Sequence, residues 1–182
     1  MQGLGGLAPG LNRGATMSGN KGGTNDGSYG GKPMRTAGAT PVSDTFTAPS
    51  AGLYRVGLYG AGAIGPSAGG GAGALAVRTL RLQKDELLPY TIAPNDDTGT
   101  ASTITFRDGV MTANSPTGAT GATATGGDIN LTGGNGSGAT GGAAPSYDGL
   151  VGGSAAFTPG GGSNHPAGIP GSGMIIITKI GD

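Results

Sequence analysis

The fold is decided by residues 53–73, LYRVGLYGAGAIGPSAGGGAG, in which a strand-like run passes directly into glycine. Tyr54, Val56 and Leu58 recur at every second position, the period that is typical of a β-strand with one buried face. From Gly60 to Gly73 glycine dominates instead. The first part therefore predicts a sheet, and the second predicts a backbone that packs closely against other backbone.

Further runs of β-prone residues extend this prediction along the chain. Asp108-Gly109 predicts a hairpin between two of them, and the continuous apolar run at the end predicts a central strand buried on both faces. No segment has a helical period. We therefore expect an all-β fold, a small glycine-rich β-sandwich or barrel-like domain with essentially no helix. The predicted strands are 53–59, 74–82, 88–93, 102–107, 110–113 and 174–180, and residues 49–52 before the first of them are a predicted turn.

Residues 118–142, GATGATATGGDINLTGGNGSGATGG, follow a different period. Every third position from 118 to 142 carries six Gly, two Ala and one Asn. A period of three fits an extended helix of the polyproline II type, whose backbone makes no internal hydrogen bonds. Glycine along one edge would let neighbouring helices approach and bond each other's backbones. The alternative is a Gly-Thr linker without fixed structure.

Composition limits the classes of function. The chain has 43 Gly and 12 Pro in 182 residues, with 10 basic and 10 acidic residues and no Cys. Zero net charge without a basic stripe argues against nucleic acid as a partner, and no apolar run is long enough to span a membrane. With no Trp and three Phe the core is small, which favours a homo-oligomer, with a trimer as the working expectation.

Residues 1–44 have no apolar period and are set apart from a β domain at 45–182. They are either a flexible leader or an extended N-terminal arm that anchors the protein in an assembly. In the second reading, single large side chains enter grooves of a neighbouring protein. These candidate partner-binding anchors are Leu4, Leu7, Leu11, Met17, Tyr29 and Met34.

One motif suggests a cofactor site. Gly60, Gly62 and Gly65 form GxGxxG after a strand, the pattern of a dinucleotide-binding loop. That site needs a helix next, whose N-terminal amides hold the pyrophosphate. Four glycines in residues 66–73 disfavour a helix by about 1 kcal/mol each. We therefore expect no dinucleotide site here.

Other polar residues do not form a recognisable reactive site. His165 is the only histidine and lies in a loop-like Gly-Gly-Ser-Asn-His-Pro stretch, so no zinc site or Ser-His-Asp set is predicted. The Asp96-Asp97 pair and the group Asp128, Asn130 and Asn135 offer oxygen ligands, but without the spacing of a calcium loop. We expect no catalytic, cofactor-binding or metal-binding residues, and no enzymatic activity.

Residues from about 46 to 180 resemble a glycine-rich domain family of tailed-bacteriophage structural proteins. The resemblance is carried by the order of short motifs: 46–52 (FTAPSAG), 60–62, 69–73, 105–109 (TFRDG), 124–128 (ATGGD) and 173–178 (GMIIIT). It implies a location in the virion and no enzymatic activity. Some phage adhesins of similar composition pack polyglycine helices into a sandwich.

Three functions follow as expectations. The first is a capsid decoration (cement) or head-fibre subunit on the particle surface, with the major capsid protein as partner. The second is a tail-fibre or tail-tip adhesin that contacts fibre or tail proteins and binds a host cell-surface glycan or protein through its glycine-rich loops. The third is a structural protein of a bacterial cell surface.

Overall fold

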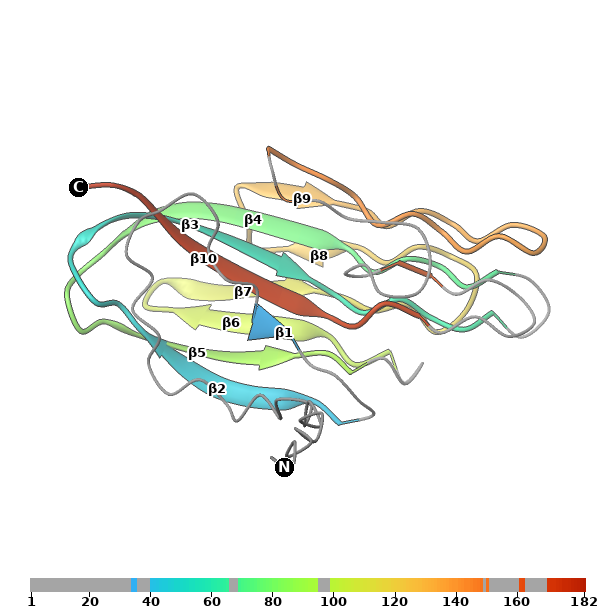
Figure 1. The fold of residues 1–182 in the computed structure, drawn as a ribbon, viewed down its shortest axis with the longest axis horizontal. Helices are drawn as coiled ribbons and strands as arrows, with labels where there is room; N and C mark the ends of the chain where they lie inside the picture. The colour runs from blue at the N-terminus through green and yellow to red at the C-terminus, as the bar shows by residue number, and fades with distance from the viewer. Residues whose placement is uncertain are drawn as a thin grey trace, which may run out of the picture.

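The fold is described from a computed structural model, which describes residues 34–35, 40–65, 69–94, 99–148, 150, 161–162 and 170–182. These residues form two antiparallel five-stranded sheets packed face to face (Figure 1). The first sheet has the order β1-β10-β3-β4-β9, and the second has the order β2-β5-β6-β7-β8. No helix occurs in the described residues, none of which therefore crosses a membrane as a long apolar helix. The expected all-β sandwich is confirmed.

The strands lie close to where the sequence predicts them. Each of the six predicted strands is present, and the hairpin at Asp108-Gly109 is the β6–β7 turn. The strands are β1 Met34–Arg35, β2 Val42–Thr47, β3 Gly52–Tyr59, β4 Leu75–Leu82, β5 Leu87–Ile92, β6 Ser102–Phe106, β7 Gly109–Ala113, β8 Ala124–Thr125, β9 Ile129–Leu131 and β10 Met174–Gly181.

The main core lies between the sheets and uses the alternation seen in the sequence. Tyr54, Val56 and Leu58 of β3 face inward with exposures of 1 % or less. The ring of Tyr54 meets Phe46 edge-on, with ring centroids 6.2 Å apart, and the Tyr54 hydroxyl donates to the Ser50 carbonyl. That bond joins β3 to the turn that connects it to β2 of the other sheet, so the connection between the two sheets is anchored in one core.

The prediction for β10 needs correction. Ile175 and Ile177 are fully buried between the sheets, but Ile176 on the other face is half-buried and Ile180 is 43 % exposed. β1 pairs only with Met174 and Ile175. Burial on both faces is therefore confined to the first residues of β10, because only there does neighbouring structure cover the outer face.

The outer face of the first sheet has a second, smaller core. Tyr59, Leu75, Val77, Leu150 and Met174 are its buried members. Leu150 reaches this face from the segment after β9, and it sits where β3 carries Gly57. A Cβ on Gly57 would lie 2.6 Å from Leu150 Cδ1. Glycine at 57 thus leaves the space that the leucine fills.

Candidate functional site

Beyond one end of the two sheets, extended segments without regular strand pairing pack side by side (Figure 1). We call this region the glycine array. Backbone hydrogen bonds connect its segments to one another and to the ends of the strands. The array consists of residues 60–65, 69–74, 114–123, 132–143, 161–162 and 170–173.

The segment 69–74 lies at the centre of the array, because it bonds to three different neighbours. Its carbonyl at Gly71 accepts from Ala63 N at 2.9 Å, its amide at Gly71 donates to Gly118 O at 2.6 Å, and Ala72 N donates to Gly134 O at 2.9 Å. A strand in a flat sheet bonds to two neighbours in one plane. Bonds to three neighbours are what packed threefold helices make.

Glycine is required where these segments touch. A Cβ added at Gly121, Gly133 or Gly136 would overlap a backbone carbonyl of a neighbouring segment. The overlapped oxygens are those of Gly133, Ala72 and Gly69, respectively. Backbone carbonyls held in a hydrogen-bonded array have little room to move. The same overlap with a carbonyl occurs at Gly60, Gly62, Gly69, Gly70, Gly71, Gly73, Gly142 and Gly162.

The threefold phase predicted for 118–142 is present, but one continuous helix is not. The contact positions 121, 133, 136 and 142 all lie in that phase. Between them the chain forms β8 in one sheet and β9 in the other. Gly126, with φ 77°, turns the chain from β8 in the second sheet toward β9 in the first sheet. The region is therefore two array segments separated by a crossing between the sheets.

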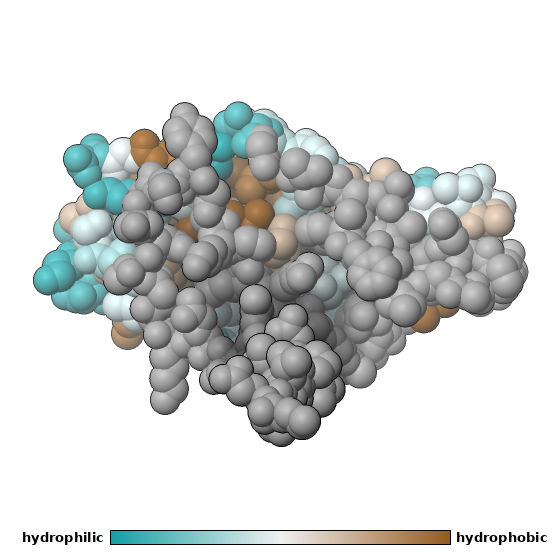
Figure 2. All heavy atoms as spheres, viewed as in Figure 1, coloured by the Kyte–Doolittle hydropathy of each residue, from teal (hydrophilic) through white to brown (hydrophobic). Residues whose placement is uncertain are grey.

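Small side chains fill the space between the segments. Ala61, Ala63, Ala72 and Ala74 are buried at 1 % exposure or less. The coloured surface at the array end is mainly pale, as expected for Gly, Ala, Ser and Thr (Figure 2). The array is thus closely packed backbone and methyl groups, with few groups able to do acid–base chemistry.

The GxGxxG motif is part of the array. Gly60 N donates to Ala74 O at 3.0 Å, and Gly62 N donates to Gly171 O at 2.8 Å. Amides that bind a phosphate must point at the ligand, whereas these two are used in packing. The observation supports the sequence argument against a dinucleotide site at Gly60–Gly65.

The proposed oxygen ligands have other partners. Asp128 Oδ2 accepts from Thr79 N at 2.7 Å, Asn130 Oδ1 accepts from Gly127 N at 3.1 Å, and Asn135 Oδ1 accepts from Gly121 N at 2.8 Å. Each side chain satisfies a backbone donor of its own neighbourhood, and no group of three acidic or histidine ligands gathers within the described part of the chain. Asp96, Asp97 and His165 lie outside the described residues.

Most candidate anchors of the arm also lie outside the described residues: Leu4, Leu7, Leu11, Met17 and Tyr29. Met34 lies in β1, where it pairs with Ile175 of β10. The predicted boundary between residues 44 and 45 falls within β2. Part of the segment assigned to the arm thus contributes strands to both sheets.

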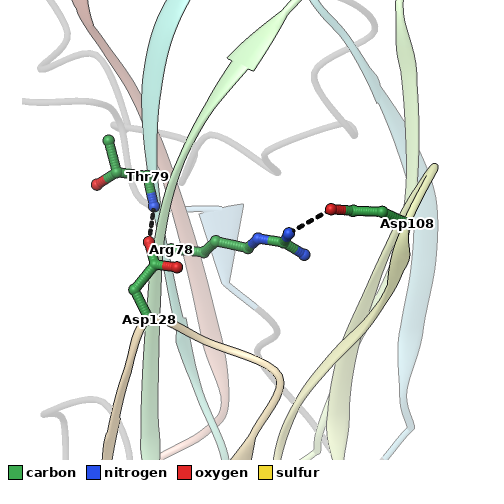
Figure 3. Close-up of polar contacts among 4 residues, drawn as sticks. All are labelled: Arg78, Thr79, Asp108 and Asp128. Carbon is green, nitrogen blue, oxygen red and sulfur yellow. Dashed lines mark hydrogen bonds and ion pairs between the residues drawn. The ribbon is translucent and has the colours of Figure 1, made fainter.

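An ion pair joins the two sheets between the middle of β4 and the β6–β7 turn (Figure 3). Arg78 Nη2 lies 2.6 Å from Asp108 Oδ2 in the β6–β7 turn, and its guanidinium stacks over Phe106 at 4.9 Å from the ring centroid. The hydrogen bond and charge of Arg78 lower the pKa of Asp108. Arg78 therefore covers the margin of the core with its stem and fixes the turn with its charge.

The outer face of the second sheet carries a row of hydroxyls that the sequence did not single out. Register aligns one hydroxyl from every strand, from the β2 edge to the β8 edge. At the β2 edge, Ser43 Oγ and Thr91 Oγ1 are 2.8 Å apart. In the sequence, threonines at alternate positions of the strands indicate outward-facing hydroxyls. Only the strand register shows that these hydroxyls align in one row, which consists of Ser43, Thr91, Thr103, Thr112 and Thr125.

Tyr59, where β3 enters the array, has a fully buried hydroxyl without a hydrogen-bond partner in the described structure. Burial raises the pKa of Tyr59. The folded state therefore holds the phenol proton more tightly than the unfolded state, and stability should fall as pH rises above the unfolded value of about 10.

Tyr59→Phe removes an unsatisfied buried hydroxyl, so we expect it to raise stability at pH 7 by about 1 kcal/mol. It should also flatten the loss of stability at alkaline pH, as measured by urea unfolding at several pH values. Tyr54→Phe is the matched control, because it removes a hydroxyl that is bonded to Ser50 O at 2.9 Å. Equal effects of the two changes would contradict the assignment.

No protein-family model and no curated protein matches this sequence. The likeness to phage structural proteins therefore rests on the motifs quoted above.

Proposed function

We propose that this protein is a non-enzymatic structural protein on the surface of a bacteriophage particle, acting as a capsid decoration or head-fibre subunit. The observation that carries the proposal is the glycine array. Its glycine amides bond to neighbouring backbone, and close packing uses glycine where an enzyme loop would offer amides to a ligand. The array extends a two-sheet sandwich into a longer, densely bonded body (Figure 1), which suits a projecting structural module.

The position of β1 in the first sheet supports the proposal that residues 1–33 anchor the protein in the particle. Met34 and Arg35 add to the edge of the first sheet beside β10. Residue 34 thus lies at a sheet edge, where the protein can be anchored to a neighbouring subunit. In this proposal residues 1–33 bind other virion proteins, and the sandwich and array face outward.

A second candidate is a tail-tip adhesin, and one observation favours it. Ser137 and Thr140 exchange backbone hydrogen bonds of 2.9 Å and close a tight turn, which Gly69 N fixes by donating to Gly138 O at 2.7 Å. A short turn held on a packed scaffold is a common way to present recognition residues. In this reading the turn contacts a host receptor.

Copy number in purified particles separates the two. Quantitative mass spectrometry against the major capsid protein should find hundreds of copies for a decoration protein. A handful of copies would contradict decoration and favour the adhesin, and absence from particles would overturn both. Deletion of residues 1–33, which leaves every described strand in place, should abolish incorporation while the remaining domain stays folded.

A further inference from the structure

The hydroxyl row borders a groove that is opened by a proline. The β5–β6 pairing is observed at Tyr90–Ile104 and Thr91–Thr103, and it ends where Pro89 would face Thr105. Proline has no amide hydrogen to donate to the neighbouring strand. On the other side β5 stays in register with β2, since Pro89 pairs with Thr45. The two strands β5 and β6 are therefore no longer paired from Pro89 toward Leu87, within the sheet.

The result is a shallow depression of about 360 Å³ on the outer face of the second sheet. Hydroxyl side chains of three strands supply most of its lining. The residues concerned are Ser43 and Thr45 of β2, Thr91 of β5, and Thr103 and Thr105 of β6, with Pro89 between them. Each hydroxyl can donate one hydrogen bond and accept two, so the Ser43–Thr91 contact leaves further capacity at both groups.

We propose that this groove binds a neutral saccharide. A sugar offers the same mixture of donors and acceptors as the groove, and the Pro89 ring provides a small apolar surface for its C–H face. The volume lies at the low end of the range for small-molecule sites, roughly 300–1,000 Å³, which fits a short saccharide unit and is too small for a folded partner.

The charges of the groove select against acidic ligands. Asp44 is the ionisable carboxylate in the lining, and the lining has no lysine, arginine or histidine. Asp44 Oδ1 accepts from Thr45 N at 2.7 Å, so the carboxylate lies at the β2 edge of the groove. A phosphate or a sialic acid would meet this charge without a cation to balance it. The proposal is therefore limited to uncharged sugars.

The test is ligand-observed saturation-transfer NMR on the full chain, with lactose, maltose, cellobiose and chitobiose as neutral probes. Sialyllactose and glucose 6-phosphate serve as acidic comparators. We expect saturable transfer to at least one neutral disaccharide and weaker or no transfer to the acidic pair. Absence of transfer to every neutral probe, or stronger binding of an acidic one, would overturn the proposal.

Variants then locate the binding to the groove. Thr91→Val and Thr103→Val keep β-branched, strand-prone side chains and should each weaken binding about tenfold, the effect of one lost hydrogen bond. Thr112→Val is the matched control: it lies in the same row on β7 but outside the groove lining, so binding should be unchanged. Equal losses in all three would contradict the assignment.

Pro89→Val supplies the missing amide and should close the β5–β6 ladder. We expect loss of saccharide binding together with unchanged or higher thermal stability, so that loss of binding is separated from loss of folding. If Pro89→Val binds as the wild type does, the groove is not the site.

The same variants test the saccharide proposal and the proposed virion role independently of each other. Thr91→Val and Thr103→Val should leave copy number in particles unchanged, because the arm at residues 1–33 carries the anchoring in the proposed function. Loss of saccharide binding with normal incorporation is the expected result. A loss of incorporation in these two variants, with Thr112→Val normal, would mean that the groove contacts another virion protein, which would overturn the saccharide proposal.

Discussion

Gly121→Ala is expected to destabilise the protein by about 3 kcal/mol or more, at the upper end of the cost of overpacking. A methyl group at 121 would overlap the carbonyl oxygen of Gly133. That oxygen cannot move freely, because Gly133 N is itself bonded to Ala122 O at 2.9 Å and the two segments run together. Urea unfolding followed by circular dichroism measures the change in the free energy of unfolding.

Gly118→Ala is the matched control, three residues earlier in the same threefold phase. A Cβ at Gly118 meets no atom within 4 Å, and its φ lies outside the left-handed region. Alanine should therefore be neutral there, or stabilising by up to about 1 kcal/mol through the unfolded state. If the two variants unfold at the same urea concentration, Gly121 does not pack closely against the backbone of Gly133.

Leu150→Ala is expected to cost about 2–3 kcal/mol, the usual range for a buried leucine. Leu150 is 7 % exposed and packs on the outer face of the first sheet with Tyr59, Leu75, Val77 and Met174. Its loss removes the side chain that holds the segment after the array onto that sheet. Thermal and urea unfolding both report the change.

A double-mutant cycle with Gly57→Ala tests the contact itself. Gly57→Ala alone brings a methyl within 2.6 Å of Leu150 Cδ1, so the leucine must shift. In the Leu150→Ala background the same methyl enters vacated space. The double variant should therefore be more stable than the sum of the single changes predicts, by about 1 kcal/mol. Strict additivity would show that Leu150 does not pack at Gly57.

The strands of the main core could be predicted because their side chains record which face is buried. Tyr54, Val56 and Leu58 alternate in the sequence and lie inward in the structure. The short strands β1, β8 and β9 escaped prediction, since two or three residues carry too little pattern and are placed by their partners. The edge strand β2 escaped it as well, because Phe46 is the one buried residue among its six. β10 was predicted with the right start and an end one residue short, at Ile180. Burial on both faces was assigned to too many of its residues, because nothing local in the sequence shows which of them neighbouring structure covers.

The array and the hydroxyl row differ in how much the sequence shows. A period of three in 118–142 indicated which glycines would touch backbone, and Gly121, Gly133 and Gly136 do so. It did not show which segments are neighbours, because glycine has no side chain to mark a face. The row from Ser43 to Thr125 depends on four strand registers, and register is set by the whole sheet.

The glycine segments form an ordered body that is continuous with the sandwich. Amide hydrogen exchange, followed residue by residue by NMR, tests it most directly. Gly71, Ala72 and Gly134 donate backbone bonds inside the array, so their amides should exchange as slowly as those of Val56 and Leu58 in β3. Exchange of these three amides at the rate of an unstructured chain, with β3 protected, would contradict the account.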